Sequence, residues 1–288
     1  MTAEETPASS TIDDTTQAQT TTDVTTDATA DSQEAAPTTE ALEWHAPVLV
    51  RIDEHTTIPH LLKERVQRGA TRPLILRKIG IGDTWRSITA REFYDEVHAL
   101  AAGLIARGLE PGDRVAIMSR TRYEWTLLDF ACWAAGLVPV PIYETSSIDQ
   151  VAHVLVDADV HLIITETVSM AEIVRAAAER EDRDNTHVLS LDSEAIETLI
   201  ADGSATPRER VLARSEALTK DDIATIVYTS GTTGTPKGTV LSHENFTNLC
   251  LNAHAWMPEI AAGKNSRLLL FLPLAHVFAR FLQVFQIS

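Results

Sequence analysis

Cysteine is scarce in this chain, and its scarcity excludes two kinds of protein. Only Cys132 and Cys250 occur among 288 residues, and they lie far apart in apolar surroundings. Two isolated thiols cannot build the disulfide framework of a small secreted protein, and by themselves they cannot hold a metal cluster. We therefore expect a protein of a reducing compartment, the cytoplasm.

The chain also lacks an uninterrupted apolar run long enough to cross a membrane. Its most apolar segment extends from residue 125 to residue 142, but charged, glycine and proline residues divide this segment into a helix and a short strand. The interrupting residues are Asp129, Gly136, Pro139 and Pro141. No transmembrane helix is predicted.

Positive charge is the third scarce feature. The chain has 24 Lys and Arg residues against 41 Asp and Glu residues, which gives a formal net charge of −17 and a pI near 4.9. The basic residues form no cluster. Neither nucleic acid nor an anionic membrane surface is therefore expected to attract the protein over long range.

The first 42 residues form an acidic, threonine-rich tail. They contain nine acidic residues and thirteen threonines, but no Lys, Arg or aromatic residue. The apolar surface of this segment is too small to offset the entropy cost of ordering its backbone. We therefore expect residues 1–42 to be disordered. They lack the basic start and apolar centre of a secretory signal. A solvated spacer is the favoured interpretation over partner recruitment or cation binding.

The remaining residues alternate between helical and strand patterns from Leu74 onward, in units of about thirty residues. This alternation is typical of βαβ units, so the predicted fold class is α/β with mostly parallel sheets. A hairpin of residues 74–77 with 84–88 is expected to precede these units. The expected strands cover residues 114–118, 138–143, 161–165, 187–191, 223–229 and 267–272.

Helix boundaries are also visible in the sequence. Thr89 with Glu92 and Thr121 with Glu124 each have the hydroxyl-x-x-Glu spacing of a capping box. They predict that helices cover residues 90–107 and 122–135, each ended by a glycine. Further helices are expected over residues 148–156 and 170–179.

The most informative segment is residues 228–238, which reads Tyr-Thr-Ser-Gly-Thr-Thr-Gly-Thr-Pro-Lys-Gly. Its glycines let backbone N–H groups turn inward, its hydroxyls add donors, and Lys237 adds a positive charge. Such a loop can surround the oxygens of a polyphosphate, so ATP is the first candidate ligand. The glycines are Gly231, Gly234 and Gly238, and the candidate hydroxyl donors are Thr229, Ser230, Thr232 and Thr233.

This loop is not an ordinary P-loop. Counted from Gly231, Pro236 stands where the second glycine belongs and Gly238 where the magnesium-binding hydroxyl belongs. A Ser/Thr/Gly linker is the alternative interpretation, and the length and order of the motif argue against it. The apolar run from Ile223 predicts a buried strand before the loop, and Ser242 predicts a helix start after it. We therefore expect the loop to lie between a strand and a helix.

At these residues the chain resembles the adenylate-forming superfamily, whose signature is Tyr-Thr-Ser-Gly-Thr-Thr-Gly-x-Pro-Lys-Gly. Two further segments resemble long-chain acyl-CoA synthetases, namely Val-Pro-Val-Pro-Ile-Tyr-Glu-Thr-Ser-Ser at 138–147 and Phe-Leu-Pro-Leu-Ala-His-Val-Phe-Ala-Arg at 271–280. The resemblance covers about residue 44 to the last residue. It implies that residues 43–288 are the N-terminal part of an AMP-binding domain.

The resemblance implies a two-step ligase reaction. A fatty carboxylate attacks the α-phosphorus of ATP to give an acyl-adenylate and pyrophosphate, and the thiol of coenzyme A then displaces AMP. It implies that Thr229 is a ligand of Mg²⁺. It also implies that residues Ser230, Gly231, Thr232, Thr233 and Gly234, together with Lys237, hold the β- and γ-phosphates. A lipid-like substrate makes peripheral contact with the inner face of the membrane compatible with a cytoplasmic protein.

His276 is the second catalytic candidate beside Lys237. In the resembled family this histidine lies near the acyl carboxylate and the nucleotide, whereas outside such a motif a histidine after a strand is more often structural. Phe278, Phe281 and Phe285 follow at helical spacing. They fit either an acyl tunnel or the apolar stripe of a helix, and core packing is favoured.

The chain ends at Ser288 within an apolar helical pattern that has no terminating glycine or proline. We therefore expect a fragment that precedes the C-terminal domain and is inactive as a ligase by itself. Two alternatives stay open. The complete enzyme could activate another acid, as medium-chain, aryl or fatty-acyl-AMP ligases do, or the chain could be a non-catalytic nucleotide-binding protein. Fatty-acid chain length and oligomeric state are not encoded in any recognisable pattern.

Overall fold

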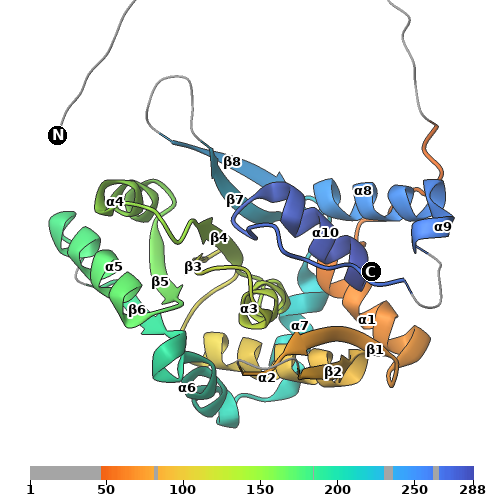
Figure 1. Ribbon diagram of the computed structural model, residues 1–288, viewed down its shortest axis with the longest axis horizontal. Coiled ribbons are helices and arrows are strands. Elements are labelled where there is room, and N and C mark those ends of the chain that lie inside the picture. The colour runs from red at the N-terminus through yellow and green to blue at the C-terminus, as the bar shows by residue number, and fades with distance from the viewer. Residues whose placement is uncertain (1–46, 81–83, 184, 230–235, 262–265) are drawn as a thin grey trace, which may run out of the picture. The chain divides into compact units, whose positions relative to one another are not determined.

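The computed structural model describes residues 47–80, 84–183, 185–229, 236–261 and 266–288. A four-stranded parallel sheet forms its centre, with the strand order β4-β3-β5-β6 (Figure 1). The strands are β3 (Arg114–Met118), β4 (Val138–Ile142), β5 (Val160–Thr165) and β6 (His187–Ser190). This sheet confirms the predicted α/β class and the four expected strands within it, which differ from the predicted ranges by one residue at most.

Helices cover both faces of this sheet because successive strand residues point to opposite sides. On β3, Val115 and Ile117 pack into a cluster with α2 (Ala90–Ala106) and α3 (Tyr123–Ala134). Ala116 and Met118 pack on the other face with α4 (Ile148–Asp157) and α5 (Val168–Arg180). The two layers of helices lie on either side of the sheet in Figure 1.

Two prolines make β4 the edge of the parallel sheet. Pro139 and Pro141 pair in register with Val115 and Ile117 of β3, and neither proline has an N–H to offer a further strand. Contact with the next sheet is instead made by a side chain, because Thr225 Oγ1 donates to the carbonyl oxygen of Pro139 at 2.7 Å.

Two antiparallel pairs flank the parallel sheet. The first, β1 (Pro73–Lys78) with β2 (Trp85–Thr89), confirms the predicted hairpin. The second joins β7 (Ile223–Thr229) to β8 (Lys237–Ser242). The prediction missed β8, and it was wrong in placing the 228–238 loop between a strand and a helix. The loop joins two antiparallel strands, and α8 (His243–Trp256) begins only after β8.

The predicted strand at residues 267–272 is also wrong, since this segment is irregular. Its apolar side chains include Leu269 and Phe271, which are 71% and 74% exposed, so no sheet face covers them. Helix α10 (Val277–Ile287) follows. The remaining helices are α1 (Ile58–Gly69), α6 (Ala195–Asp202), α7 (Arg208–Ala217) and α9 (Pro258–Ala261), with two short 3₁₀ turns at Leu191–Ser193 and Gly203–Ala205.

One predicted capping box is present and the other is not. Thr89 and Glu92 cap α2 reciprocally, as expected. Helix α3 instead starts after Arg122, which makes no side-chain cap, and Thr121 has other partners. Cys132 and Cys250 are both buried free thiols. Among the described residues no helix is long and apolar enough to span a membrane.

Candidate functional site

The candidate phosphate loop begins and ends on the β7–β8 hairpin. Thr229, the last residue of β7, is the register partner of Lys237, the first residue of β8. Both residues are exposed. The structure therefore brings together two of the predicted site residues, a hydroxyl and an ammonium group, at the base of the loop. The five predicted site residues within the loop itself lie outside the described residues. They are Ser230, Gly231, Thr232, Thr233 and Gly234.

A close approach of side chains explains the glycine that follows Lys237. A Cβ atom on Gly238 would lie 2.9 Å from Cγ2 of Ile226 and 3.1 Å from Cζ of Tyr228. Distances this short require a neighbour to move, so this position near the start of β8 favours glycine over larger residues. Gly238 thus allows the Tyr228 ring to lie across the base of the loop.

Both ends of the loop are anchored to α4. Tyr228 donates its hydroxyl to the Asp157 carboxylate at 2.6 Å, and Nε2 of His153 is 2.7 Å from the carbonyl oxygen of Pro236. The rings of His153 and Tyr228 also meet edge to face at 5.8 Å. Burial, followed by the hydrogen bond to Asp157, raises the pKa of Tyr228, so its hydroxyl stays a donor. Sequence reasoning missed Asp157 and His153 because no local pattern links them to the loop.

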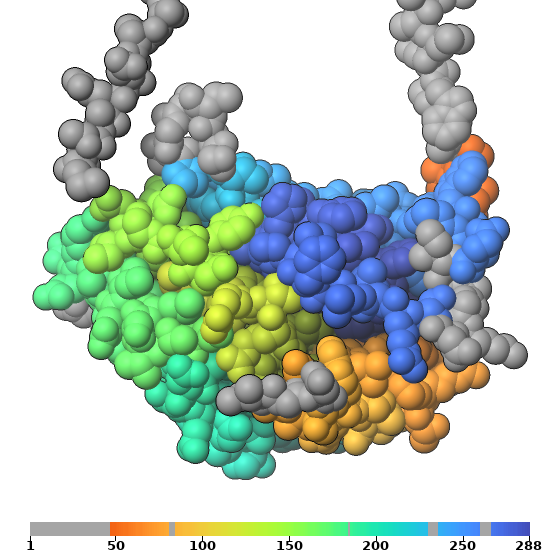
Figure 2. All heavy atoms as spheres, in the orientation of Figure 1, coloured from red at the N-terminus to blue at the C-terminus, as the bar shows by residue number. Residues whose placement is uncertain are grey.

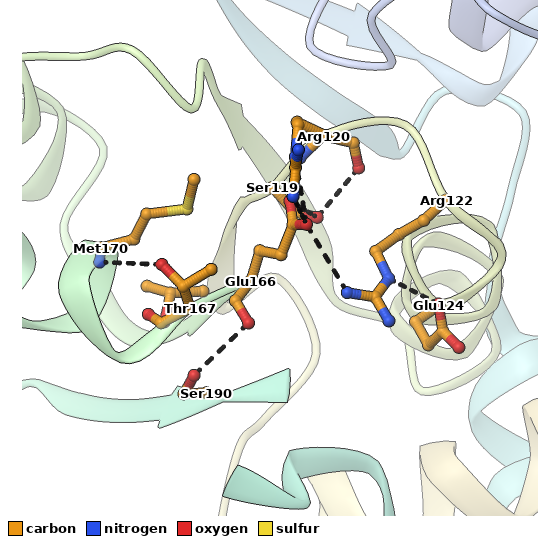
Figure 3. A network of polar contacts seen from close by, with 9 residues as sticks. Ser119, Arg120, Arg122, Glu124, Glu166, Thr167, Met170 and Ser190 are labelled. Atoms are coloured by element: carbon orange, nitrogen blue, oxygen red, sulfur yellow. Dashed lines mark hydrogen bonds and ion pairs between the residues drawn. The ribbon is translucent and has the colours of Figure 1, made fainter. Parts of the chain in front are cut away.

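A polar network lies at the carboxyl edge of the parallel sheet (Figure 3). Glu166 follows β5 directly and is 5% exposed. Its carboxylate accepts from the Arg120 backbone N–H at 2.8 Å, from Arg120 Nη2 at 2.6 Å and from Ser119 Oγ at 3.3 Å. Arg122 Nη1 lies 3.7 Å away. These contacts join the residues that follow β3 to those that follow β5.

The charge of Glu166 is stable in this setting. Burial opposes the ionised form, but the hydrogen bonds from Arg120 and the charges of Arg120 and Arg122 outweigh burial and hold the pKa of Glu166 below its usual range. The chain passes to opposite sides of β3 to reach β4 and β5, and open α/β sheets bind ligands at such a point. This topological rule could have identified Glu166 from the predicted strands.

His276 lies on a different element from the hairpin. It is the N-cap of α10, where its Nδ1 accepts from the backbone N–H of Phe278 at 3.3 Å. The residue is exposed, and the cap leaves Nε2 as the ring nitrogen that can meet a substrate. Among the described residues, no hydrogen bond joins His276 to Thr229 or Lys237.

The three phenylalanines after His276 have unequal surroundings. Phe278 is 53% exposed, Phe281 is partly buried and Phe285 is 8% exposed. Neighbouring rings of the series lie 6.2 Å and 5.7 Å apart. Phe285 therefore belongs to the core, as favoured from the sequence, and the series passes outward to the surface at the first turn of α10.

Within the described residues, no group of three or more His, Cys, Asp and Glu side chains could hold a metal ion. At the hairpin, a nucleotide and its magnesium ion would meet two of the described groups. The exposed Thr229 hydroxyl is a suitable oxygen donor, and Lys237 beside it can neutralise phosphate charge. The donor set fits a nucleotide with its magnesium ion.

Comparison with known proteins agrees with this geometry. The profile of the AMP-binding enzyme family matches residues 62–287, so the chain belongs to this family. It is 38% identical over 240 residues to the long-chain-fatty-acid–CoA ligase FadD15 of Mycobacterium bovis and to that of Mycobacterium tuberculosis. These alignments cover 83% of this chain and 40% of each relative. The chain thus spans about 40% of the length of the curated relatives it matches.

Comparison of the fold with solved structures leads to the same family. A solved Mycobacterium tuberculosis fatty acyl CoA synthetase superposes with a TM-score of 0.64 at 26% identity, over 82% of this chain and 44% of that one. The α/β architecture is therefore that of adenylate-forming enzymes, as the sequence resemblance predicted.

Proposed function

We propose that the protein containing this chain activates a long-chain fatty acid as its acyl-adenylate and then transfers the acyl group to coenzyme A, with release of pyrophosphate and AMP. The observation that carries this proposal is the match to long-chain fatty-acid ligases over 83% of the chain, which includes the hydroxyl–lysine pair at the base of the loop. Residues 43–288 then form the N-terminal part of the AMP-binding domain.

Lys237 and Thr229 act on the phosphates in this proposal. Attack of the carboxylate on the α-phosphorus builds negative charge on the phosphoryl oxygens, and fixed cationic and hydroxyl groups stabilise that charge. The ammonium of Lys237 neutralises the β- and γ-phosphates, with donors from residues 230–234. The Thr229 hydroxyl would hold a magnesium ion, which would screen the charge of the leaving pyrophosphate.

His276 serves the acyl side of the reaction. With Nδ1 engaged in the helix cap, a neutral imidazole carries its proton on Nε2 and can donate to the fatty carboxylate. Such a contact would orient the attacking oxygen, and orientation contributes strongly to the rate of a bimolecular step. No protein nucleophile is required, because AMP is already a good leaving group for the thiolate of coenzyme A.

The partners in this proposal are a fatty acid, ATP and coenzyme A. A cytoplasmic protein with peripheral contact at the inner face of the membrane would meet its lipid-like acid there.

The test is pyrophosphate release by the purified, complete gene product, measured with ATP, Mg²⁺ and a panel of acids. We expect release with long-chain fatty acids and formation of their CoA thioesters. Lys237→Ala is expected to lower kcat/KM by about 10²–10³-fold, the usual effect of removing one transition-state donor. Lys63→Ala is the matched control, because Lys63 of α1 forms an ion pair with Glu216 of α7. The Lys63 variant is expected to release pyrophosphate at the rate of the parent. Parent-like release by the Lys237 variant, or a preference for short or aryl acids, would contradict the proposal.

A further inference from the structure

The hydroxyl of Thr121 joins the loop before α3 to the irregular segment before α10. Thr121 Oγ1 donates to the carbonyl oxygen of Leu272 at 2.7 Å and accepts from the N–H of Leu274 at 3.1 Å. These two backbone groups flank Pro273, which has no N–H of its own. One half-buried side chain thus satisfies a donor and an acceptor in a segment that has no strand or helix partner.

This segment leads within a single turn to His276. The backbone N–H of His276 donates to the carbonyl oxygen of Pro273 at 2.9 Å, and the ring of His276 then caps α10. The position of the imidazole therefore depends on the path of residues 272–275. Leu274 and Ala275 are buried, so that path is packed as well as hydrogen-bonded.

A buried ion pair fixes α10 one turn beyond His276. Arg280 Nη2 lies 2.7 Å from Oδ1 of Asp129 on α3, and both side chains are 0% exposed. Gln283 Nε2 donates to the other oxygen of Asp129 at 3.0 Å, and Gln283 Oε1 accepts from Thr126 at 2.9 Å. The residues of α3 and its preceding loop therefore hold the His276 segment on both sides. Figure 2 shows yellow-green and blue segments in contact on this face of the molecule, with the buried contacts beneath the surface.

The loop that carries Thr121 is itself anchored to the parallel sheet. Its neighbour Arg120 donates both a backbone N–H and guanidinium groups to the buried Glu166 at the end of β5 (Figure 3). Arg122, on the other side, approaches the same carboxylate. Thr121 thus has little freedom to follow a movement of residues 272–276.

We propose that Thr121 is a positioning residue for His276, and that it does this by holding both backbone groups that flank Pro273. The inference rests on the proposed function, in which His276 orients the fatty carboxylate. A displacement of about 1 Å in a group that orients a substrate can cost about 10²-fold in rate. Loss of the Thr121 hydroxyl leaves the Leu272 carbonyl and the Leu274 N–H without this partner, so the segment is expected to shift.

The experiment compares Thr121→Val, Thr121→Ala and Thr121→Ser in the complete gene product, each alone and combined with His276→Ala. Acyl-adenylate formation is followed by pyrophosphate exchange. The valine and alanine variants are expected to lower kcat about 10–100-fold and to leave the KM for ATP within about 3-fold of the parent, because they disturb only the acyl side. The serine variant keeps the hydroxyl and is expected to stay within about 3-fold of the parent rate.

The combined variants separate positioning from a general structural role. If Thr121 acts through His276, Thr121→Val adds less than about 2-fold to the loss that His276→Ala causes alone. A full additional loss in that background, or parent-like kcat in both hydroxyl-free variants, would overturn the proposal while leaving the ligase function intact. Should Thr121→Val fail to fold, the smaller Thr121→Ala provides the same comparison.

An NMR titration of the His276 imidazole gives a second readout that does not depend on activity. The valine variant is expected to shift the imidazole resonances of His276, and the serine variant is expected to keep them at the parent positions. Resonances unchanged by valine would overturn the positioning role even if catalysis were lost. An inactive parent would instead refute the proposed function. A His276→Ala variant as fast as the parent would refute the role of His276 and this inference with it, and would leave the ligase function intact.

Discussion

His243 is a buried residue whose protonation links stability to pH. It lies at the start of α8, is 1% exposed, and its Nδ1 accepts from the backbone N–H of Ile58 at 3.3 Å. Burial lowers its pKa from 6.5 to about 4. Burial likewise lowers the pKa of His98 to about 4, with a smaller effect from Arg208. Both histidines are therefore neutral in the folded protein near neutral pH.

These two histidines predict a loss of stability in mild acid. Between pH 6.5 and pH 4 the unfolded chain takes up a proton at each site and the folded chain does not, so the free energy of unfolding falls as the pH falls through this window. Each histidine is expected to contribute a fall of about 3 kcal/mol, because its pKa of about 4 in the folded protein lies well below its ordinary value of 6.5. Above pH 6.5 their contribution is constant.

Urea unfolding at several pH values measures this effect. His243→Asn keeps an acceptor for Ile58 and removes the titrating ring, so it is expected to flatten the dependence between pH 6.5 and pH 4. The exposed residue His187 provides the control, since His187→Asn is expected to keep the slope of the parent. An equal slope for the parent and the His243 variant would refute this prediction.

Gly103 predicts a steric effect on stability. A Cβ atom at this position of α2 would lie 1.9 Å from the carbonyl oxygen of Leu199 on α6, and a Cβ atom on Gly203, the residue after α6, would lie 2.4 Å from the backbone nitrogen of Gly103. The obstructing atoms belong to the backbone and cannot rotate away. Gly103→Ala is therefore expected to lower the free energy of unfolding by about 1–3 kcal/mol or more, measured by chemical denaturation.

Gly69 is the matched control for Gly103. It also lies in a helix, but the atoms nearest to a Cβ atom there belong to the flexible side chain of Arg72. Gly69→Ala is expected to be neutral or to stabilise the protein by up to about 1 kcal/mol, because alanine favours the helix. A smaller loss for Gly103→Ala than for Gly69→Ala would contradict the steric explanation.

At the scale of elements, the pairing of α3 with α10 rests on charge buried between them. Arg280 donates a hydrogen bond to the Asp129 carboxylate in a fully buried setting, and the guanidinium lies 5.6 Å from the centre of the Trp133 ring. Arg280 Nε and Nη1 have no hydrogen-bond partner among the described residues. Burial raises the pKa of Asp129 against the opposing charge of Arg280. The pair therefore depends on both partners being present.

Removal of one partner is expected to destabilise this contact strongly. Asp129→Ala leaves Arg280 buried without a counter-charge, which typically costs about 3–5 kcal/mol in unfolding free energy. Asp95 offers a comparison, because it pairs with Arg208 at 3.4 Å while 47% exposed. Asp95→Ala is expected to cost less than about 1 kcal/mol. Thermal and urea unfolding of both variants measure the two losses of unfolding free energy. Equal losses for Asp129→Ala and Asp95→Ala would contradict this prediction.

The elements of the parallel sheet were predictable because their patterns are local. Apolar β-branched runs and cap residues such as Thr89 identify each strand and helix from a few neighbouring residues. Strand β8 was not predicted, because the strand begins with polar or small residues and most of residues 237–242 are exposed. Its pairing with β7 depends on the hairpin as a whole, so no periodic pattern in β8 alone reveals it.

At the scale of the whole molecule, charge and composition are unevenly distributed along the chain. Residues 1–42 hold nine acidic residues, which is more than half of the net charge of −17, yet no aromatic side chain. The described residues contain the two apolar clusters on either side of the parallel sheet. We therefore expect these two apolar clusters, and not residues 1–42, to stabilise the folded protein.

Deletion of residues 1–42 tests this division. The shortened chain is expected to unfold within about 2 °C of the parent in a calorimetric scan, because a segment of this composition buries too little apolar surface to contribute. Its isoelectric point is expected to rise, since nine carboxylates are lost. A drop in the unfolding temperature of more than about 5 °C would show that the tail packs against the rest of the protein.

By itself the sequence determined the α/β class, the residue ranges of the four parallel strands, the apolar surroundings of the two cysteines and the phosphate-loop signature, because each of these depends on neighbouring residues. Only the tertiary structure decided the partners of Thr121, Asp129 and Tyr228. Thr121 has the spacing of a helix cap but bonds to residues about 150 positions away, and Asp129 meets Arg280 across a similar separation. Such contacts arise when separate elements pack, and the lowest free energy of a buried polar group depends on all of its neighbours in space.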